Sequence, residues 1–202
     1  MQAIWVFVTN LGDTAVTVPL AVLTCCFLGA ARQVRLAFVW SFAILGCAGV
    51  IGALKLLLAA CEPGPAFAGM LSPSGHTAMS TAIYGSLSLL IAHSSPPVVR
   101  AVVYSGGILL ISGIGASRVA LRDHTPAEVV AGLIIGVCAV AGVRIMLAKQ
   151  PAITLPIRWL IGAAVILVAL LHGKRWPAEQ ALWDFTGFLQ LLAPRCSGTG
   201  AS

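Results

Sequence analysis

The feature that most limits how this chain can fold is a series of long apolar segments separated by short polar stretches. A segment of about 20 apolar residues crosses a bilayer as an α-helix. The candidate segments are Thr14–Ala31, Leu36–Ala60, Thr77–His93, Val98–Ala116, Pro126–Leu147 and Thr154–His172. Only 9% of the 202 residues are charged, whereas 59% are hydrophobic. The sequence therefore predicts an all-α polytopic membrane protein with about six transmembrane helices.

The two ends of the chain differ from these segments. The first 13 residues carry Ile4, Trp5 and Phe7, which predict a short interfacial helix with an aromatic anchor. After Gly173 aromatic residues alternate with charged ones, which predicts a surface helix followed by a loose end rich in Ser and Gly. We therefore expect a transmembrane domain over residues 1–173 and an extramembrane tail over residues 174–202.

The basic residues indicate which loops face the cytoplasm. One alternating set of loops, with one helix end, contains no acidic residue and holds Arg32, Arg35, Arg100, Arg144, Lys149 and Arg158. The positive-inside rule places this set in the cytoplasm. The loops at Cys61–His76 and Ser117–Thr125 then face outward, as expected for a bacterial inner-membrane protein with a periplasmic site. The positive residues are scattered and form no basic cluster with aromatics, so nucleic acid is not an expected partner.

The cysteines give no indication of a metal site. Four of the six fall in apolar segments, where a small buried hydrophobe is expected, and they are Cys25, Cys26, Cys47 and Cys138. No CxxC or Cys/His pattern with zinc spacing is present. Cys61 and Cys196 both lie on the predicted outward side, where they form either a disulfide or two free thiols.

Two polar features lie near the outward ends of predicted helices. Lys55 is a charge close to the end of an apolar segment, so it either snorkels to the interface or serves a site. Ser74 is a good N-cap for the next helix, Gly75 permits close approach of a ligand, and His76 falls in the first turn. Free N–H groups at such a helix start favour an anion such as phosphate. The alternative is a capped helix with an incidental histidine.

A third feature precedes the segment that starts at Pro126. The run Thr125-Pro126-Ala127-Glu128 has the pattern of a capping box with Pro at the first helical position. Glu128 is either this reciprocal cap or the acceptor of a hydrogen bond from His124, which would leave the other ring nitrogen nucleophilic. The topology puts both histidines and Arg118 on one side of the membrane, with Lys55 near that end of its helix. Such a set can carry out phosphoryl transfer without a metal.

These residues resemble the type-2 phosphatidic acid phosphatase superfamily, whose members are also called lipid phosphate phosphatases. That family carries three blocks in order: K-x6-R-P, P-S-G-H and S-R-x5-H-x3-D. The corresponding residues here are Lys55-x6-Glu62-Pro63, Pro73-Ser74-Gly75-His76 and Ser117-Arg118-x5-His124-x3-Glu128. Two positions depart from the pattern, because Glu62 replaces an arginine and Glu128 replaces an aspartate. Either Arg122 substitutes for that arginine, or Glu62 points away, or the site is weakened.

The resemblance implies a role for each matching residue. His124 attacks the phosphorus and forms a phosphohistidine, and Glu128 orients it. His76 protonates the leaving oxygen and then activates water. The phosphate-binding residues implied are Lys55, Arg118, Ser74, Gly75 and, as the substitute, Arg122. No metal or other cofactor is required.

The activity implied is metal-independent hydrolysis of a phosphate monoester or pyrophosphate of a membrane lipid in the bilayer. The candidate substrates are an isoprenoid pyrophosphate such as undecaprenyl pyrophosphate, phosphatidic acid, phosphatidylglycerol phosphate and a lipid A phosphate. One alternative is transfer of the phosphoryl group to a second lipid. Another is a catalytically silent transporter or binding protein on the same scaffold, for which Glu62 is the best support.

Overall fold

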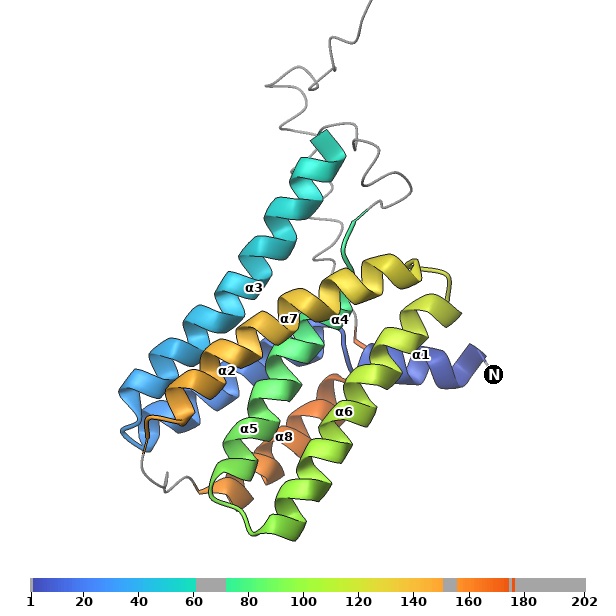
Figure 1. Cartoon of the computed structure of the whole chain (residues 1–202). Helices are drawn as coiled ribbons and strands as arrows, with labels where there is room; N and C mark the ends of the chain where they lie inside the picture. Colours follow the sequence, from blue (N-terminus) through green and yellow to red (C-terminus); the bar gives the residue numbers. More distant parts are fainter. Residues whose placement is uncertain (1, 61–71, 151–155, 175, 177–202) are drawn as a thin grey trace, which may run out of the picture.

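A computed structural model describes residues 2–60, 72–150, 156–174 and 176 of the chain. Within these residues the regular secondary structure is entirely helical (Figure 1). The elements in chain order are α1 (Gln2–Asn10), α2 (Thr14–Ala30), α3 (Val34–Ala60), α4 (Gly75–Ser80), the π-helical turn η2 (Thr81–Gly85), α5 (Ser86–His93), α6 (Pro97–Ala120), α7 (Pro126–Leu147) and α8 (Ile157–Leu171). The predicted all-α class is confirmed.

The helices agree with the predicted membrane spans in position. Four helical stretches are long and apolar enough to cross a membrane, and they are Gln2–Ala30, Val34–Leu58, Pro97–Ala120 and Pro126–Leu147. The other two predicted spans are also helical where they are described: α4, η2 and α5 follow one another without a break, and α8 is a shorter apolar helix. The prediction of a polytopic helical membrane protein is therefore confirmed.

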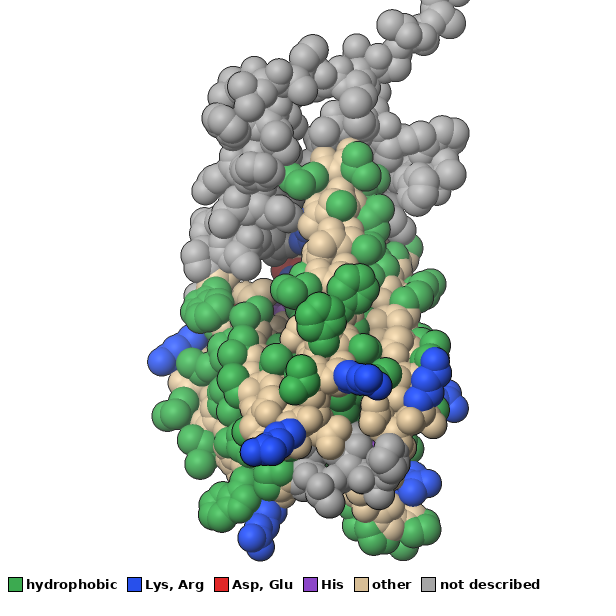
Figure 2. Space-filling model, turned by 90° about the vertical axis from the view of Figure 1, so that its left-hand side faces the viewer, with side chains coloured by type: hydrophobic (Ala, Val, Ile, Leu, Met, Phe, Trp, Pro, Cys, Tyr) green, Lys and Arg blue, Asp and Glu red, His purple; other side chains and the backbone are tan. Residues whose placement is uncertain are grey.

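The outer faces of these helices are apolar. Large hydrophobic side chains such as Phe38, Phe42 and Leu109 are each more than 70% exposed. In water such a surface would be strongly unfavourable, whereas lipid tails cover it without that penalty. Figure 2 shows this apolar surface over much of one face, with most of the Lys and Arg side chains of that face in its lower half.

Helix α7 packs against α3, α4 and η2 and holds the centre of the bundle together. Two glycines on α7 make the contact with α4 close. A Cβ atom at Gly132 would lie 2.5 Å from the carbonyl oxygen of Ser74, and one at Gly136 would lie 2.6 Å from that of Ala78. This spacing is the small-residue pattern by which membrane helices approach each other. As a result, the first turns of α4 and α7 lie side by side.

The buried core continues from this contact toward α2 and α3. Trp40 of α3 is among the most buried side chains, and its indole N–H donates to the carbonyl oxygen of Ala21 on α2 at 3.1 Å. Helices α2, α4 and α7 begin at the same end of the bundle, where α3 and α6 end (Figure 1). The functional residues expected from the sequence all come from this end.

Candidate active site

Three helices begin at the candidate site, and each has a side-chain cap. Asp13 caps α2 by accepting a hydrogen bond from the Ala15 N–H at 2.8 Å. Ser74 caps α4 and accepts from the N–H of Thr77 at 3.4 Å. Thr125 caps α7 by accepting from the Glu128 N–H at 3.3 Å. The caps predicted at Ser74 and Thr125 are therefore confirmed, and the caps fix where each helix starts.

His124 and Glu128 form a buried pair at the start of α7. The ring Nδ1 of His124 lies 3.1 Å from Oε2 of Glu128, and the two side chains are only 8% and 4% exposed. The same Oε2 accepts the Thr125 N–H at 2.9 Å, which completes the capping box. The other oxygen, Oε1, accepts the Ser72 N–H at 2.8 Å. Glu128 therefore serves as helix cap and as histidine partner together, although the sequence posed these as alternatives.

The surroundings of His124 favour its neutral form. Burial lowers the pKa of His124 below its ordinary value of 6.5, although the hydrogen bond to Glu128 acts in the opposite direction. The positive charges of Arg118 and Lys55 lower this pKa further. Since the carboxylate of Glu128 can only accept, the ring proton lies on Nδ1 and the lone pair on Nε2. This arrangement makes Nε2 of His124 available as a nucleophile at neutral pH.

Arg118 lies in the last turn of α6 and is buried. Its Nη1 donates to the Thr9 hydroxyl at 3.1 Å and forms an ion pair with Asp123 at 3.0 Å. Its carbonyl oxygen accepts the backbone N–H groups of Asp123 and His124. These bonds turn the chain at the end of α6, so that the guanidinium and the His124 ring come from one short turn.

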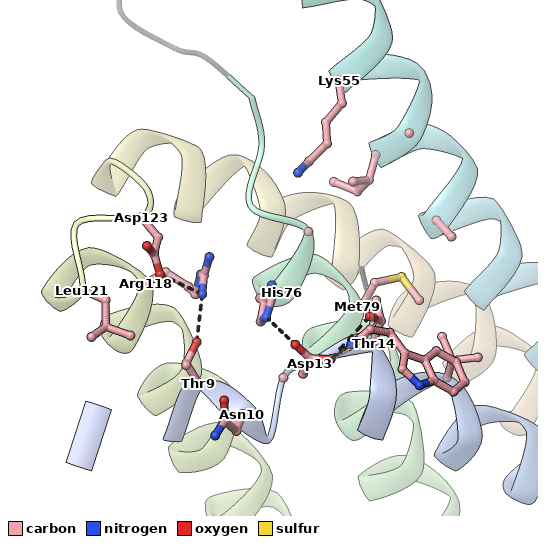
Figure 3. A pocket seen from close by; sticks show the side chains of 17 residues that line it. Thr9, Asn10, Asp13, Thr14, Lys55, His76, Met79, Arg118, Leu121 and Asp123 are labelled. Carbon is pink, nitrogen blue, oxygen red and sulfur yellow. Dashed lines mark hydrogen bonds and ion pairs between the residues drawn. The ribbon is translucent and has the colours of Figure 1, made fainter. Parts of the chain in front are cut away.

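His76 lies in the first turn of α4, as the sequence predicted. Its Nε2 is 3.7 Å from Oδ2 of Asp13, the N-cap of α2 (Figure 3). Asp13 was not among the residues expected at the site. The available signal was its position as the single acidic residue of the N-terminal segment, directly before an apolar helix that starts with Thr14.

A cavity of about 520 Å³ opens between these helix ends. Its polar wall includes Lys55, His76, Arg118 and Asp13, which Figure 3 shows together around the cavity. Lys55 is buried despite its charge, and Gly75 contributes backbone to the same wall. The apolar part of the wall is formed by Val18, Ala48, Ile51 and Met79. The cavity thus joins an end lined by cations and carboxylates, which include Asp123, to an apolar side.

Four of the predicted site residues are not on this wall. Ser74 and His124 are each next in sequence to a wall residue, and Glu128 contacts both of them; Ser74 and Glu128 are buried. The Ser74 N–H donates to the Glu128 carbonyl oxygen at 3.0 Å, so this N–H is engaged within the protein. Arg122 is exposed, has a positive φ of 61°, and does not line the cavity. The structure therefore does not bring Arg122 to the other phosphate-binding candidates.

The remaining expectations concern residues outside the described part of the chain. Glu62, Cys61 and Cys196 all lie there. The effect of Glu62 in place of the family arginine and the pairing of Cys61 with Cys196 therefore stay predictions. Among the described residues, no group of three or more His, Cys, Asp or Glu side chains is placed to hold a metal ion.

Comparison with known proteins identifies the family of the chain. The model of the PAP2 superfamily matches residues 55–152, which contain all three sequence blocks. An "Uncharacterized 22.5 kDa protein in cps region" of Klebsiella pneumoniae is 30% identical over 186 residues, with 88% of each chain covered. No solved structure matches the chain. The chain belongs to the PAP2 superfamily, whose members are phosphatases, so the family expected from the sequence is confirmed.

Proposed function

We propose that this protein hydrolyses a phosphate monoester or pyrophosphate of a membrane lipid through a phosphohistidine at His124. The observation that carries the proposal is the buried pair of His124 and Glu128, with Arg118 in the adjacent turn. The pair supplies a neutral nucleophile with a defined tautomer, and the cation supplies charge for a phosphoryl group.

In the first step, Nε2 of His124 attacks the phosphorus while the bond from phosphorus to the lipid oxygen breaks. His76 gives its proton to that leaving oxygen, so that a phosphate monoester releases the neutral lipid alcohol and a pyrophosphate releases the lipid monophosphate. Lys55 and Arg118 bind the phosphoryl oxygens and offset the negative charge that develops on them. Glu128 accepts the Nδ1–H of His124 throughout and stabilises the positive charge on the phosphorylated ring.

In the second step, water attacks the same phosphorus and the bond from phosphorus to nitrogen breaks. His76, which is now neutral, accepts the proton from this water and returns to its starting state. His124 leaves as the neutral ring with its proton still on Nδ1. Lys55 and Arg118 supply the positive charge in both steps, so the reaction is proposed to need no metal ion.

The cavity wall supports a lipid rather than a soluble phosphate ester. Val18, Ala48, Ile51 and Met79 all belong to membrane helices and line the cavity beside its charged end. A phosphate at Arg118 would therefore have its apolar chain along these residues. The loops that hold most of the basic residues lie at the opposite helix ends, which supports a site on the periplasmic face of a bacterial inner membrane.

The test is phosphate release from a panel of lipid phosphates in detergent micelles. The panel contains phosphatidic acid, phosphatidylglycerol phosphate, an isoprenoid pyrophosphate and a lipid A phosphate. We expect the wild type to release inorganic phosphate from at least one member and the His124→Ala variant to release none. Absence of release from every member by the folded wild type would contradict the proposal, as would transfer to added lipid alcohols in place of release.

A further inference from the structure

The junction between α1 and α2, residues Thr9–Thr14, reaches into the candidate site from outside the matched family region. That region starts at residue 55. Thr9 nevertheless contacts Arg118, and Asp13 contacts His76. We propose that Asp13 is a positioning residue that fixes the ring of His76 for proton transfer to the leaving oxygen; this role rests on the function proposed above.

The two oxygens of Asp13 have separate partners. Oδ1 accepts the N–H of Ala15 at 2.8 Å and that of Trp176 at 3.4 Å. Oδ2 faces Nε2 of His76 at 3.7 Å, which is within ion-pair distance. Hydrogen bonds at catalytic groups are often long without substrate and tighten when it binds. One oxygen therefore anchors the carboxylate to the start of α2, and the other is directed at the histidine.

This contact assigns different tasks to the two ring nitrogens. A carboxylate oxygen accepts hydrogen bonds only, so when this 3.7 Å ion pair shortens to a hydrogen bond, Nε2 is the donor and carries a proton. That leaves Nδ1 of His76 to give its proton to the leaving oxygen and later to take one from water. The side chain of His76 is 22% exposed and lines the cavity, so a substrate or a water molecule can reach it.

The junction is held firmly enough to position a ring. A Cβ atom at Gly12 would lie 2.7 Å from Cγ2 of Ile114 on α6 and 2.8 Å from Oγ of Ser80 on α4, so only glycine permits this approach. The carbonyl oxygen of Leu11, the residue before Gly12, accepts a hydrogen bond from the Tyr84 hydroxyl at 2.6 Å. The carboxylate of Asp13 is therefore fixed relative to α4, the helix that carries His76.

Two substitutions separate this role from helix capping. Asp13→Asn keeps a good N-cap but removes the carboxylate charge, because Asn and Asp cap helices about equally well. Asp13→Glu keeps the charge on a longer arm but weakens the cap. A positioning role predicts low activity with an unchanged melting temperature for Asp13→Asn, and a lower melting temperature with activity largely retained for Asp13→Glu. Capping alone predicts the same two melting temperatures but the opposite activities, retained in Asp13→Asn and lowered in Asp13→Glu, and that result would overturn the proposal.

The decisive measurement compares two leaving groups. We would measure kcat/KM for phosphatidic acid, or for the panel member hydrolysed fastest, and for p-nitrophenyl phosphate. The nitrophenolate leaves without a proton, so the second substrate does not need the acid. We expect Asp13→Asn to lower kcat/KM at least about tenfold on the lipid phosphate and less than about threefold on the nitrophenyl ester. An equal loss on both substrates would mean general distortion of the site and would contradict the role.

A double-variant cycle tests whether Asp13 acts through His76. In the His76→Ala background the Asp13→Asn change should have no further effect on kcat/KM for the lipid phosphate, because the ring that it positions is absent. An additive loss would overturn the proposal. A wild type that hydrolyses no panel member contradicts the proposed function and this role together. An active wild type with a fully active Asp13→Asn variant contradicts the role of Asp13 alone.

Discussion

The two histidines of the site are each paired with a carboxylate at the start of a helix, but the pairs differ in closeness and burial. His124 lies 3.1 Å from Glu128, and its side chain is 8% exposed. His76 lies 3.7 Å from Asp13, and its side chain is 22% exposed. In both pairs the carboxylate also accepts backbone N–H groups of its own helix start, so each pair is anchored by a cap.

The difference fits the chemistry proposed for each ring. A nucleophile needs a fixed tautomer and protection from water, because a hydrated or protonated ring attacks poorly. A general acid must exchange its proton with the substrate and then with water, so its ring must be reachable. The closer pair lies within the family region, whereas Asp13 lies outside it. One arrangement, a capped carboxylate beside a histidine, therefore occurs here with two degrees of burial, which fit the two different roles that we propose.

The largest expected effect comes from removing the ring of the buried pair. His124→Ala should lower phosphate release by roughly 10³-fold or more, since the variant lacks the ring on which the proposed covalent intermediate forms. A lipid substrate with radiolabelled phosphorus should label the wild type with an acid-labile, base-stable phosphohistidine and leave the variant unlabelled. Full activity of the variant would remove His124 from its proposed role.

Glu128→Gln tests the carboxylate of the same pair. Glutamine has one acceptor oxygen where Glu128 uses two, so it keeps either the Thr125 N–H of the capping box or the Ser72 N–H, and we expect a modest fall in the melting temperature. Loss of the negative charge should lower kcat on the order of 10²–10⁴-fold, because the tautomer and the charged intermediate lose their support. Lost stability with retained turnover would instead show that capping is the main role of Glu128.

Gly132→Ala tests the close contact between α7 and α4. This contact fixes the position of the His124–Glu128 pair relative to His76. The added Cβ meets the Ser74 carbonyl oxygen, so α7 and α4 must separate; overpacking of this kind costs about 1–3 kcal/mol of unfolding free energy. Activity should fall with stability, since His76 lies on α4 and His124 lies in the turn that leads directly into α7. Gly142→Ala on α7 is the control, because nothing lies within 4 Å of its Cβ position. Equal behaviour of the two variants in melting and kinetics would contradict this account.

The pH dependence tests the environment of His124. Protonation of this ring blocks attack, and its pKa lies below 6.5, so kcat/KM should stay high as the pH falls to 6.5 and decline only below it. Because the hydrogen bond to Glu128 raises this pKa, the decline in Glu128→Gln should move to still lower pH. The measurement is kcat/KM against pH for both proteins, and a shift toward higher pH in the variant would contradict the pairing.

The smallest expected effect is at Arg122, which belongs to neither pair. Its side chain is exposed and does not line the cavity, so Arg122→Ala should change kcat/KM less than about threefold, as expected for a surface charge. Arg118→Ala is the matched comparison and should lower kcat/KM by about 10²-fold or more. A loss at Arg122 as large as that at Arg118 would mean that Arg122 substitutes for the missing arginine after all.

The features that depend on nearby residues could be predicted from the sequence. Apolar length predicted the positions of the helices, and the pattern Thr125-Pro126-Ala127-Glu128 predicted the start of α7. His124 and Glu128 are four residues apart, and the capping box at the start of α7 brings them within reach. These predictions succeeded because bilayer thickness, capping and the helical repeat all act over short stretches of chain.

Only the tertiary structure decided which distant residues meet. The bond from the Ser72 N–H to Glu128, the pairing of Asp13 with His76 and the exclusion of Arg122 from the cavity all depend on how the helices pack. That packing rests on close approaches at Gly12, Gly132 and Gly136, which a list of apolar segments does not reveal. The sequence gives no direct signal for such contacts because apolar helices in lipid have no strong preference for one neighbour until small residues and polar bonds select it.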